Sequence, residues 1–382
     1  MTQPQPSAPK GTLRNATFDD CIEATALLTR LGLTMPEGEE AIRAYFDNLW
    51  RTNPAMQAAK TKPALGWVLE DAGEMVGFFG NVPLLYEFDG KPVIVSNASL
   101  WGVDENFRSE TPRLAEAYFG QTDVDLLLVT TAIKPTRRIF ERHGASPVAQ
   151  PDLDQVLYWV LDAGGFLRAG LRKKGHGGMA VWTGGVLGAV ALNAKMRLTG
   201  RRPFAPLQDV TPITVEEIDN AFDDLWARKL KEYPGRLLAA RDADTLKWYF
   251  GLSQQSSETR VLCCRRGGRL EGYLVLVRED APAIGLKRLK VADLFVAGDE
   301  ADTVNALLAG AYEYGLARRC HVLEVIGLPE TLRDIAMSHK PYSRPMPAFP
   351  FFFKALREDL KSPLAAADSW YVTAYDGDTA LL

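Results

Sequence analysis

Apolar residues along the chain fall into short runs bounded by turn residues and longer segments with helical spacing. In the first half, the runs predict strands and the spaced segments predict helices. The predicted strands are Trp67–Glu70, Val76–Leu85, Val93–Val103, Asp125–Thr131 and Val156–Leu161, and the predicted helices are Pro112–Gly120 and Thr136–His143. Antiparallel hairpins followed by a β-α-β-α-β run predict a mixed sheet with helices on both faces.

The second half shows the same order of elements. Its predicted strands are Val261–Cys264, Gly272–Arg278, Lys290–Val296 and His321–Ile326, followed by Phe349–Phe353 and Tyr371–Ala374. Its predicted helices are Thr303–Arg318 and Glu330–Ser338. We therefore expect Val156–Leu161 to close the first sheet and the two last strands to close the second.

Short sequence matches between the halves indicate an internal repeat. The segment GEMVGFF, which begins at Gly73, resembles GRLEGYL, which begins at Gly268, at an offset of 195 residues. The segments DLLLV, from Asp125, and HVLEV, from His321, match at an offset of 196 residues. A nearly constant offset favours duplication of one domain over two unrelated α/β domains with similar strand spacing.

The repeat and the segment between its copies divide the chain into four parts. We expect a disordered tail over 1–10, an N-terminal domain over 11–162, a linker over 163–208 and a C-terminal domain over 209–382. The tail is rich in Pro, Gln and Ser and has no apolar run, so no secretory signal peptide is predicted. The apolar run Met179–Ala194 is shorter than the ~20 residues that a membrane-spanning helix needs.

Charge and cysteine content narrow the class of protein. The 382 residues carry 44 Lys and Arg against 48 Asp and Glu, a net charge of −4, which argues against a dedicated nucleic-acid binder. Four cysteines and four histidines without metal-ligand spacing predict reduced thiols and no metal cofactor. These features predict a cytoplasmic protein.

The linker is strongly basic, unlike the chain as a whole. No Asp or Glu occurs in 163–208, and its basic residues flank the apolar run on both sides. These are Arg168, Arg172, Lys173, Lys174, Lys195, Arg197, Arg201 and Arg202. Three interpretations stay open: a contact with an anionic membrane surface, a site for a phosphorylated ligand such as a cyclic dinucleotide, or a helix packed between the halves. The first would place the protein peripherally at the inner face of the plasma membrane.

Several weak motifs resemble those of the GNAT superfamily of acyl-CoA-dependent N-acyltransferases. They are the opening RNATFDD before a helix, the G-x-x-x-G hairpin, the strand WGVDENFR leading into a helix, and IFERHGA. The closing WYVTAYDGDTALL looks like the end of tandem members encoded with bacterial polysaccharide genes, of the holdfast type. The resemblance implies an α/β protein of two tandem GNAT-like mixed-sheet domains.

The resemblance also implies a site for acetyl-CoA after the strand that ends at Val103. The family binds the pyrophosphate with a loop of pattern Q/R-x-x-G-x-G/A, which here is Arg108–Arg113. Val103, Arg108, Ser109, Thr111 and Arg113 are the implied cofactor-binding residues, with Thr111 and Arg113 in place of the two glycines. The corresponding loop of the second half, 297–302, is acidic, so we do not expect it to hold CoA in the usual way.

Candidate acid and base residues are few. Glu105, after the predicted strand, and Asp293, within the apolar VADLF, are the candidate catalytic carboxylates. Asp293 is chosen because apolar neighbours raise the pKa of a carboxyl group. Phe140 occupies the position where the family often has a tyrosine, so the usual general acid is absent, with Tyr118 and Tyr342 as substitutes.

Together these residues predict an N-acyltransferase. The resemblance implies acetyl transfer from acetyl-CoA to an amino sugar of a bacterial polysaccharide or its precursor. The alternative is a catalytically degenerate GNAT-like ligand sensor or scaffold in polysaccharide assembly, which the missing glycines and Phe140 favour. A third option, an aminoacyl-tRNA-dependent transferase, is opposed by the acidic total charge.

Overall fold

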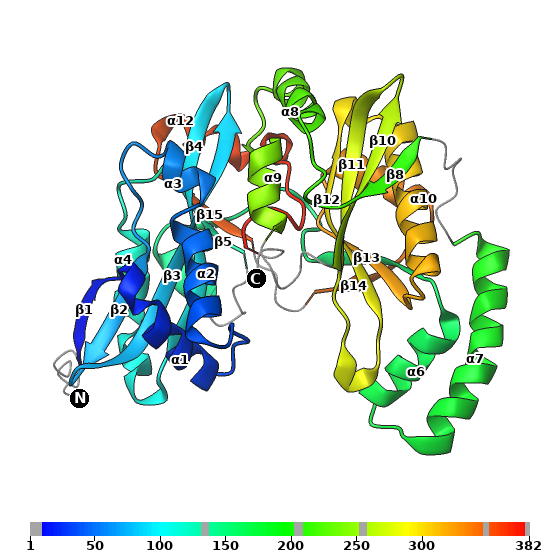
Figure 1. The fold of residues 1–382 in the computed structure, drawn as a ribbon, viewed down its shortest axis with the longest axis horizontal. Coiled ribbons are helices and arrows are strands. Elements are labelled where there is room, and N and C mark those ends of the chain that lie inside the picture. Colours follow the sequence, from blue (N-terminus) through cyan, green and yellow to red (C-terminus); the bar gives the residue numbers. More distant parts are fainter. Residues whose placement is uncertain (1–9, 131–136, 202–208, 252–257, 347–350, 379–382) are drawn as a thin grey trace, which may run out of the picture. The chain divides into compact units, whose positions relative to one another are not determined.

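The computed structural model describes residues 10–130, 137–201, 209–251, 258–346 and 351–378. The chain forms two compact units (Figure 1). Unit 1 comprises Met1–Tyr86, Lys91–Val148 and Pro350–Ala365, and unit 2 comprises Glu87–Gly90, Ala149–Phe349 and Ala366–Leu382. The predicted disordered tail lies outside the described residues except for Lys10.

Unit 1 is built on a mixed sheet in the order β1-β2-β3-β4-β5-β15-β6. Its strands are β1 (Thr12–Asn15), β2 (Gly66–Asp71), β3 (Glu74–Phe88), β4 (Lys91–Val103), β5 (Leu126–Val129), β15 (Phe352–Ala355) and β6 (Ser146–Pro147). Strands β4 and β5 are parallel, whereas β15 is antiparallel to both β5 and β6. Parallel β4 and β5 require a crossover, which α4 (Thr111–Phe119) provides.

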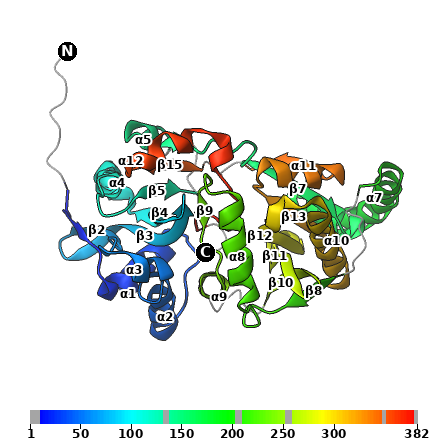
Figure 2. The same ribbon diagram turned by 90° about the horizontal axis from the view of Figure 1, so that it is seen from above.

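Helices cover both faces of this sheet (Figure 2). On one side lie α4 and α5 (Arg137–Arg142), and on the other lie α1 (Cys21–Arg30), α2 (Glu39–Trp50) and α3 (Pro54–Ala58). Helix α4 has Pro112 in its first turn, where a missing N–H costs nothing, and buries Leu114 and Tyr118, which are four residues apart. These side chains pack with Phe79 and Phe140 in one core cluster.

Unit 2 contains a second mixed sheet in the order β14-β7-β13-β12-β11-β10-β8. Its strands are β14 (Tyr342–Pro345), β7 (Gln155–Val160), β13 (Val322–Ile326), β12 (Arg288–Val296), β11 (Arg269–Arg278), β10 (Thr259–Arg266) and β8 (Val210–Ile213). Among the described residues of this sheet, β12 and β13 pair in parallel and the other neighbouring strands pair antiparallel. Its helices are α6 (Ala163–Lys173), α7 (Gly178–Thr199), α8 (Ala221–Glu232), α9 (Ala243–Phe250), α10 (Ala301–Ala317) and α11 (Glu330–Ser338).

Two strands lie in the sheet opposite to the one expected from their position in the chain. The predicted closing strand of the first half, Val156–Leu161, is β7 and pairs with β13 and β14 in unit 2. The predicted strand Phe349–Phe353 corresponds to β15, which pairs with β5 and β6 in unit 1. Both strands are apolar enough to be buried in either sheet, so their pattern predicts a strand without specifying its partner.

Two further segments differ from expectation. Tyr371–Ala374 forms no strand but is buried as irregular chain in unit 2. Most of the expected linker 163–208 is the helical pair α6 and α7, although Arg202 lies outside the described residues. The other predicted strands and helices that the structure describes occur within a few residues of their expected bounds.

All four cysteines are buried as free thiols. Burial raises the pKa of the Cys263 thiol to about 12 and also raises the pKa values of Cys21, Cys264 and Cys320. Because the thiolate is the reactive form, we expect the native protein to resist a maleimide at neutral pH and to take up four labels in denaturant. Rapid labelling of a native cysteine, measured by mass spectrometry, would contradict this burial.

Candidate functional site

Strand β4 contains a bulge close to its C-terminal end. Side chains alternate between the faces of a regular strand, yet Ala98 and Trp101 both pack in the cluster beneath α4 and α5. Leu100 has a φ of 51°, a left-handed conformation uncommon for this residue type. The extra residue bends β4 and re-aims the side chains that follow.

Beyond this region, β4 and β5 separate. Their parallel pairing runs from Val95 with Leu126 to Ala98 with Val129, whereas β4 continues to Val103. After Ala98, in the part of the chain that the structure describes, no strand pairs with the edge of β4 to which β5 is bonded earlier. Among the described residues, the backbone groups of 99–103 on that edge thus have no strand partner, an arrangement that suits an extended ligand.

The predicted cofactor-binding residues surround the end of β4. Val103 is half-buried on the α4 face of the sheet, and a 3-10 helix, Glu105–Glu110, leads directly into α4. The side chains of Arg108 and Glu105 are 68% and 84% exposed, with a nitrogen–oxygen distance of 3.8 Å. An ion pair of this length between exposed side chains contributes little to stability. Arg108 can therefore turn toward a ligand at little energetic cost.

Arg113 has a different environment from Arg108. Its guanidinium donates to Glu110 at 3.0 Å and to the carbonyl oxygens of Lys10 and Gly11. The hydrogen bond from Arg113 holds the pKa of the Glu110 carboxyl below its ordinary value. Ser109 donates to the same carboxylate, and Thr111, the first residue of α4, donates its N–H to the Arg108 carbonyl. Arg113 thus neutralises Glu110 beside the site and is already engaged by protein groups.

Sequence reasoning missed two polar residues in β4, Asn97 and Ser99. Both are buried, and the Asn97 Oδ1 and Ser99 Oγ atoms have no hydrogen-bond partner in the described structure. Alternation from Ala98 places them on the face opposite α4, where α1 packs. A buried polar atom without a partner costs about 1–3 kcal/mol, so it calls for a role. The polar pair inside the apolar run VIVSNASLW was the available signal.

Tyr118 and Phe140, the two positions considered for a general acid in unit 1, both lie in its hydrophobic core. The Tyr118 hydroxyl lies 2.8 Å from the Ser96 carbonyl oxygen and 2.7 Å from that of Leu128, just before β4 and β5 separate. Phe140 is buried in the same cluster. Tyr118 therefore joins the two strands at the point from which they diverge.

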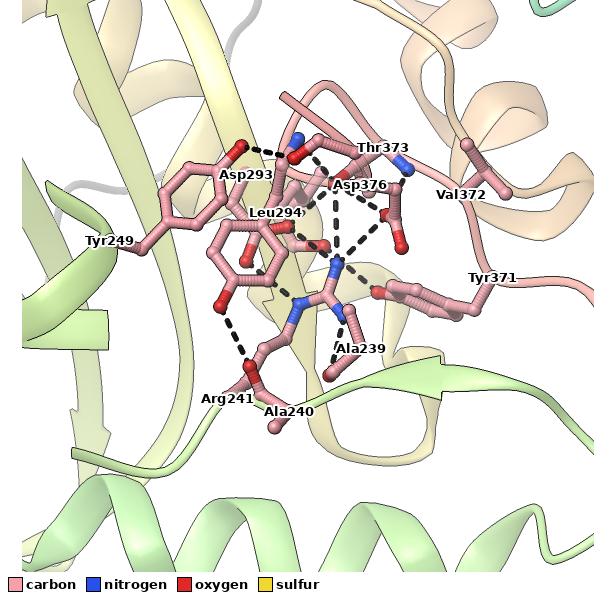
Figure 3. A network of polar contacts seen from close by, with 12 residues as sticks. Ala239, Ala240, Arg241, Tyr249, Asp293, Leu294, Tyr371, Val372, Thr373 and Asp376 are labelled. Carbon is pink, nitrogen blue, oxygen red and sulfur yellow. Dashed lines mark hydrogen bonds and ion pairs between the residues drawn. The ribbon is translucent and has the colours of Figure 1, made fainter. Parts of the chain in front are cut away.

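Asp293, the other predicted catalytic carboxylate, lies in unit 2 within a buried polar network (Figure 3). It accepts hydrogen bonds from Arg241 at 2.9 and 3.2 Å, from Tyr273 at 2.9 Å and from Thr373 at 2.8 Å. Arg241 also pairs with Asp376 at 3.2 Å. Burial opposes the charge on Arg241, but Asp293 and Asp376 raise its pKa well above the ordinary value. Glu105 and Asp293 are thus in different units.

The C-terminal segment of unit 2 occupies the place where its own parallel strands separate. Pairing of β12 with β13 ends at Val291 and Val325, while β12 continues to Val296. In this stretch the Tyr371 hydroxyl donates to the Leu294 carbonyl, and Thr373 donates to Asp293. The second sheet therefore carries protein groups at the position where, in the first sheet, no described strand pairs with the corresponding edge of β4.

Two carboxylates lie at the turn that follows β12, and one of them accepts a backbone hydrogen bond. The Gly298 N–H donates to Glu232 at 2.7 Å, and Asp299 pairs with Lys229 and Arg236. Burial lowers the pKa of Lys229, and the neighbouring Asp299 opposes this effect. A phosphate at this turn would have to displace two anionic side chains, which supports the expectation for the acidic loop 297–302.

The sequence matches neither a protein-family model nor a curated protein. Solved structures do share its fold. One is a conserved protein of unknown function from Enterococcus faecalis V583, described as a probable N-acyltransferase, with a TM-score of 0.58 and 8% identity over 91% of this chain and 73% of that one. Another is a GCN5-related N-acetyltransferase from Anabaena variabilis, with a TM-score of 0.56 and 9% identity over the same shares.

These likenesses identify the class of fold. The chain is an α/β protein of two GNAT-like mixed-sheet domains in tandem, as predicted, and its neighbours of this fold are described as N-acyltransferases. At this level of identity the likeness concerns the fold alone, so activity is argued from the residues of the site.

Proposed function

We propose that unit 1 binds an acyl-CoA, with acetyl-CoA as the simplest donor, and transfers the acyl group to an amine. One observation carries this proposal: β4 is bulged and uncovered after Ala98 and leads into a helix N-terminus next to an exposed, weakly paired arginine. The names of the structural neighbours support the reaction class. The filled counterpart in unit 2 supports one donor site per chain.

Each residue of the site has a proposed task. Backbone groups of 99–103 bind the amides of the pantetheine arm, as a strand partner would. Val103, Ser109 and Thr111 border the pyrophosphate, whose charge the α4 N-terminus and Arg108 favour. Arg113 keeps Glu110 paired and so limits its repulsion of phosphate. The unpartnered atoms of Asn97 and Ser99 offer hydrogen bonds to the reacting groups.

The chemistry requires a proton acceptor for the amine. When bound, acyl-CoA supplies a thioester whose C–S bond breaks as a C–N bond forms to the amine, and the leaving thiolate takes up a proton. We assign Glu105 to accept the ammonium proton, directly or through water, because its carboxylate is exposed beside the end of β4. We assign Asp293 a positioning role in unit 2, because Arg241, Tyr273 and Thr373 already engage it.

The proposed acceptor is an amino sugar of a bacterial polysaccharide or its precursor. The closing segment WYVTAYDGDTALL, through its resemblance, is the support for this substrate class. Phe140 in place of the family tyrosine favours the second candidate, a ligand-sensing or scaffold protein in polysaccharide assembly. Binding of acetyl-CoA without turnover of a panel of amino sugars would favour that candidate.

Calorimetric titration with acetyl-CoA tests the donor site. Arg108→Ala is expected to weaken binding by about 10- to 150-fold, since it removes a charge-assisted contact to phosphate of about 1.5–3 kcal/mol. Arg269→Ala, an exposed arginine of unit 2, is the matched control and should bind as the unchanged protein does. Absence of binding to the unchanged protein would overturn the proposal, and equal affinity of both variants would remove Arg108 from the site.

A further inference from the structure

Helix α7 exposes a row of large apolar side chains. Met179, Trp182, Leu187 and Val190 are 76%, 62%, 74% and 69% exposed, and Val186 and Leu198 are exposed as well. Residues 179, 182, 186 and 190 follow one another at intervals of three or four and therefore share one face of the helix. Single exposed apolar residues are ordinary on a protein surface, but a continuous row marks an interaction site.

This row is distinct from the face by which α7 is held. Helices α6 and α7 form a hairpin within unit 2 (Figure 1). Glycines allow the close approach: a Cβ at Gly185 would meet Arg168 at 2.5 Å, and one at Gly188 would meet Leu167 at 2.9 Å. Val181 and Gly185 are the buried positions of α7, so the packed face lies opposite the exposed row. We name the exposed row, Met179, Trp182, Val186, Leu187 and Val190, the apolar face of α7.

Positive charge lies at both ends of this face. Arg172, Lys173 and Lys174 end α6 next to the first turn of α7, and Lys195 and Arg197 lie in its last turns. Within the described residues these five side chains form no ion pair, and 163–208 contains no Asp or Glu. Unpaired cations around an apolar surface match a partner that is apolar inside and anionic outside.

We propose that the α6–α7 hairpin docks unit 2 on an anionic phospholipid bilayer. Helix α7 lies parallel to the surface with its apolar face at the boundary of headgroups and acyl chains, and the flanking lysines and arginines contact lipid phosphates. Twenty-two residues give a helix of about 33 Å, and Trp182 suits the interface region. No helix in the described ranges is both long and apolar enough to cross a membrane.

Flotation with vesicles tests this docking. We expect the full chain to float with vesicles of equal parts phosphatidylcholine and phosphatidylglycerol and to remain unbound with phosphatidylcholine alone. Trp182→Ser/Val190→Ser is expected to reduce the bound fraction at least about tenfold. Lys173→Gln/Lys174→Gln should reduce it by about the same factor and weaken its dependence on salt.

Controls separate docking from unfolding and from self-association. Leu316→Ser/Met337→Ser changes two exposed apolar residues of α10 and α11 and should float as the unchanged protein does. All variants should keep a cooperative thermal transition, which shows that each is folded. Failure of the unchanged protein to float with either vesicle overturns the proposal. So does a stable dimer in ultracentrifugation that Trp182→Ser/Val190→Ser dissociates, since the occupant is then a second copy.

Discussion

Replacing Arg241 by methionine is expected to lower the free energy of unfolding by about 3–5 kcal/mol. The guanidinium is fully buried and pairs with Asp293 and Asp376, and its removal leaves two carboxylates in the interior without their cation. Breaking a buried pair from one side costs more than the pair itself contributes, because the remaining charge stays desolvated. Tyr375, whose ring centroid lies 4.5 Å from Arg241, also loses its cationic neighbour.

Urea denaturation, followed by circular dichroism, measures this effect. Arg43→Met is the control, because Arg43 forms an exposed pair with Glu39 one helical turn away and should change stability by at most about 0.5 kcal/mol. A loss below about 1 kcal/mol for Arg241→Met would show that the network in unit 2 is solvated or differently paired.

Replacing Asn97 by leucine is expected to lower the rate of acyl transfer while leaving the free energy of unfolding nearly unchanged. The Asn97 side chain is buried with its Oδ1 unpartnered, and its Nδ2 makes one long hydrogen bond of 3.3 Å to the Ala98 carbonyl, so an apolar side chain of similar size should change the free energy of unfolding by at most about 1 kcal/mol. If Asn97 serves the reacting groups, acyl transfer should fall at least about tenfold. A residue kept at a cost in stability is typical of a functional site.

The adjacent Ser96 provides the control for this prediction. Its hydroxyl donates to Asn81 and accepts from Gln121 on the other face of β4. Ser96→Ala should therefore lower stability by about 1–2 kcal/mol and leave transfer per folded molecule nearly unchanged. Stability from denaturation and turnover with a thioester assay measure the two effects. A large loss of stability in Asn97→Leu with normal turnover would make Asn97 a structural residue.

The local pattern of the sequence was sufficient to predict the helices and strands, but not which strands pair with one another. Helix α11 occupies the predicted range Glu330–Ser338, since its apolar period and flanking turn residues are local signals. Strands β7 and β15 lie in the opposite sheets, because pairing is decided by contacts between distant residues. The bulge at Leu100 was equally hidden, since a left-handed leucine has no signature in composition.

Only the features of the site that depend on residues close together in the sequence could be predicted. Val103, Arg108, Ser109 and Thr111 do surround one strand end, because they are neighbours in sequence. The environment of Asp293 depends on Arg241 and Thr373, which are 52 and 80 residues away. No local pattern reveals such partners, so an apolar neighbourhood in sequence was mistaken for an apolar environment in the fold.

Hydrogen exchange with and without saturating acetyl-CoA tests the central claim most directly, because it locates the donor on the chain. The account predicts slower exchange of backbone amides in 99–111 of unit 1, where β4 is uncovered and α4 begins. It predicts no change in 294–303 of unit 2, where Tyr371 and Glu232 already occupy backbone groups. Protection confined to 294–303, or absent from both segments, would contradict it.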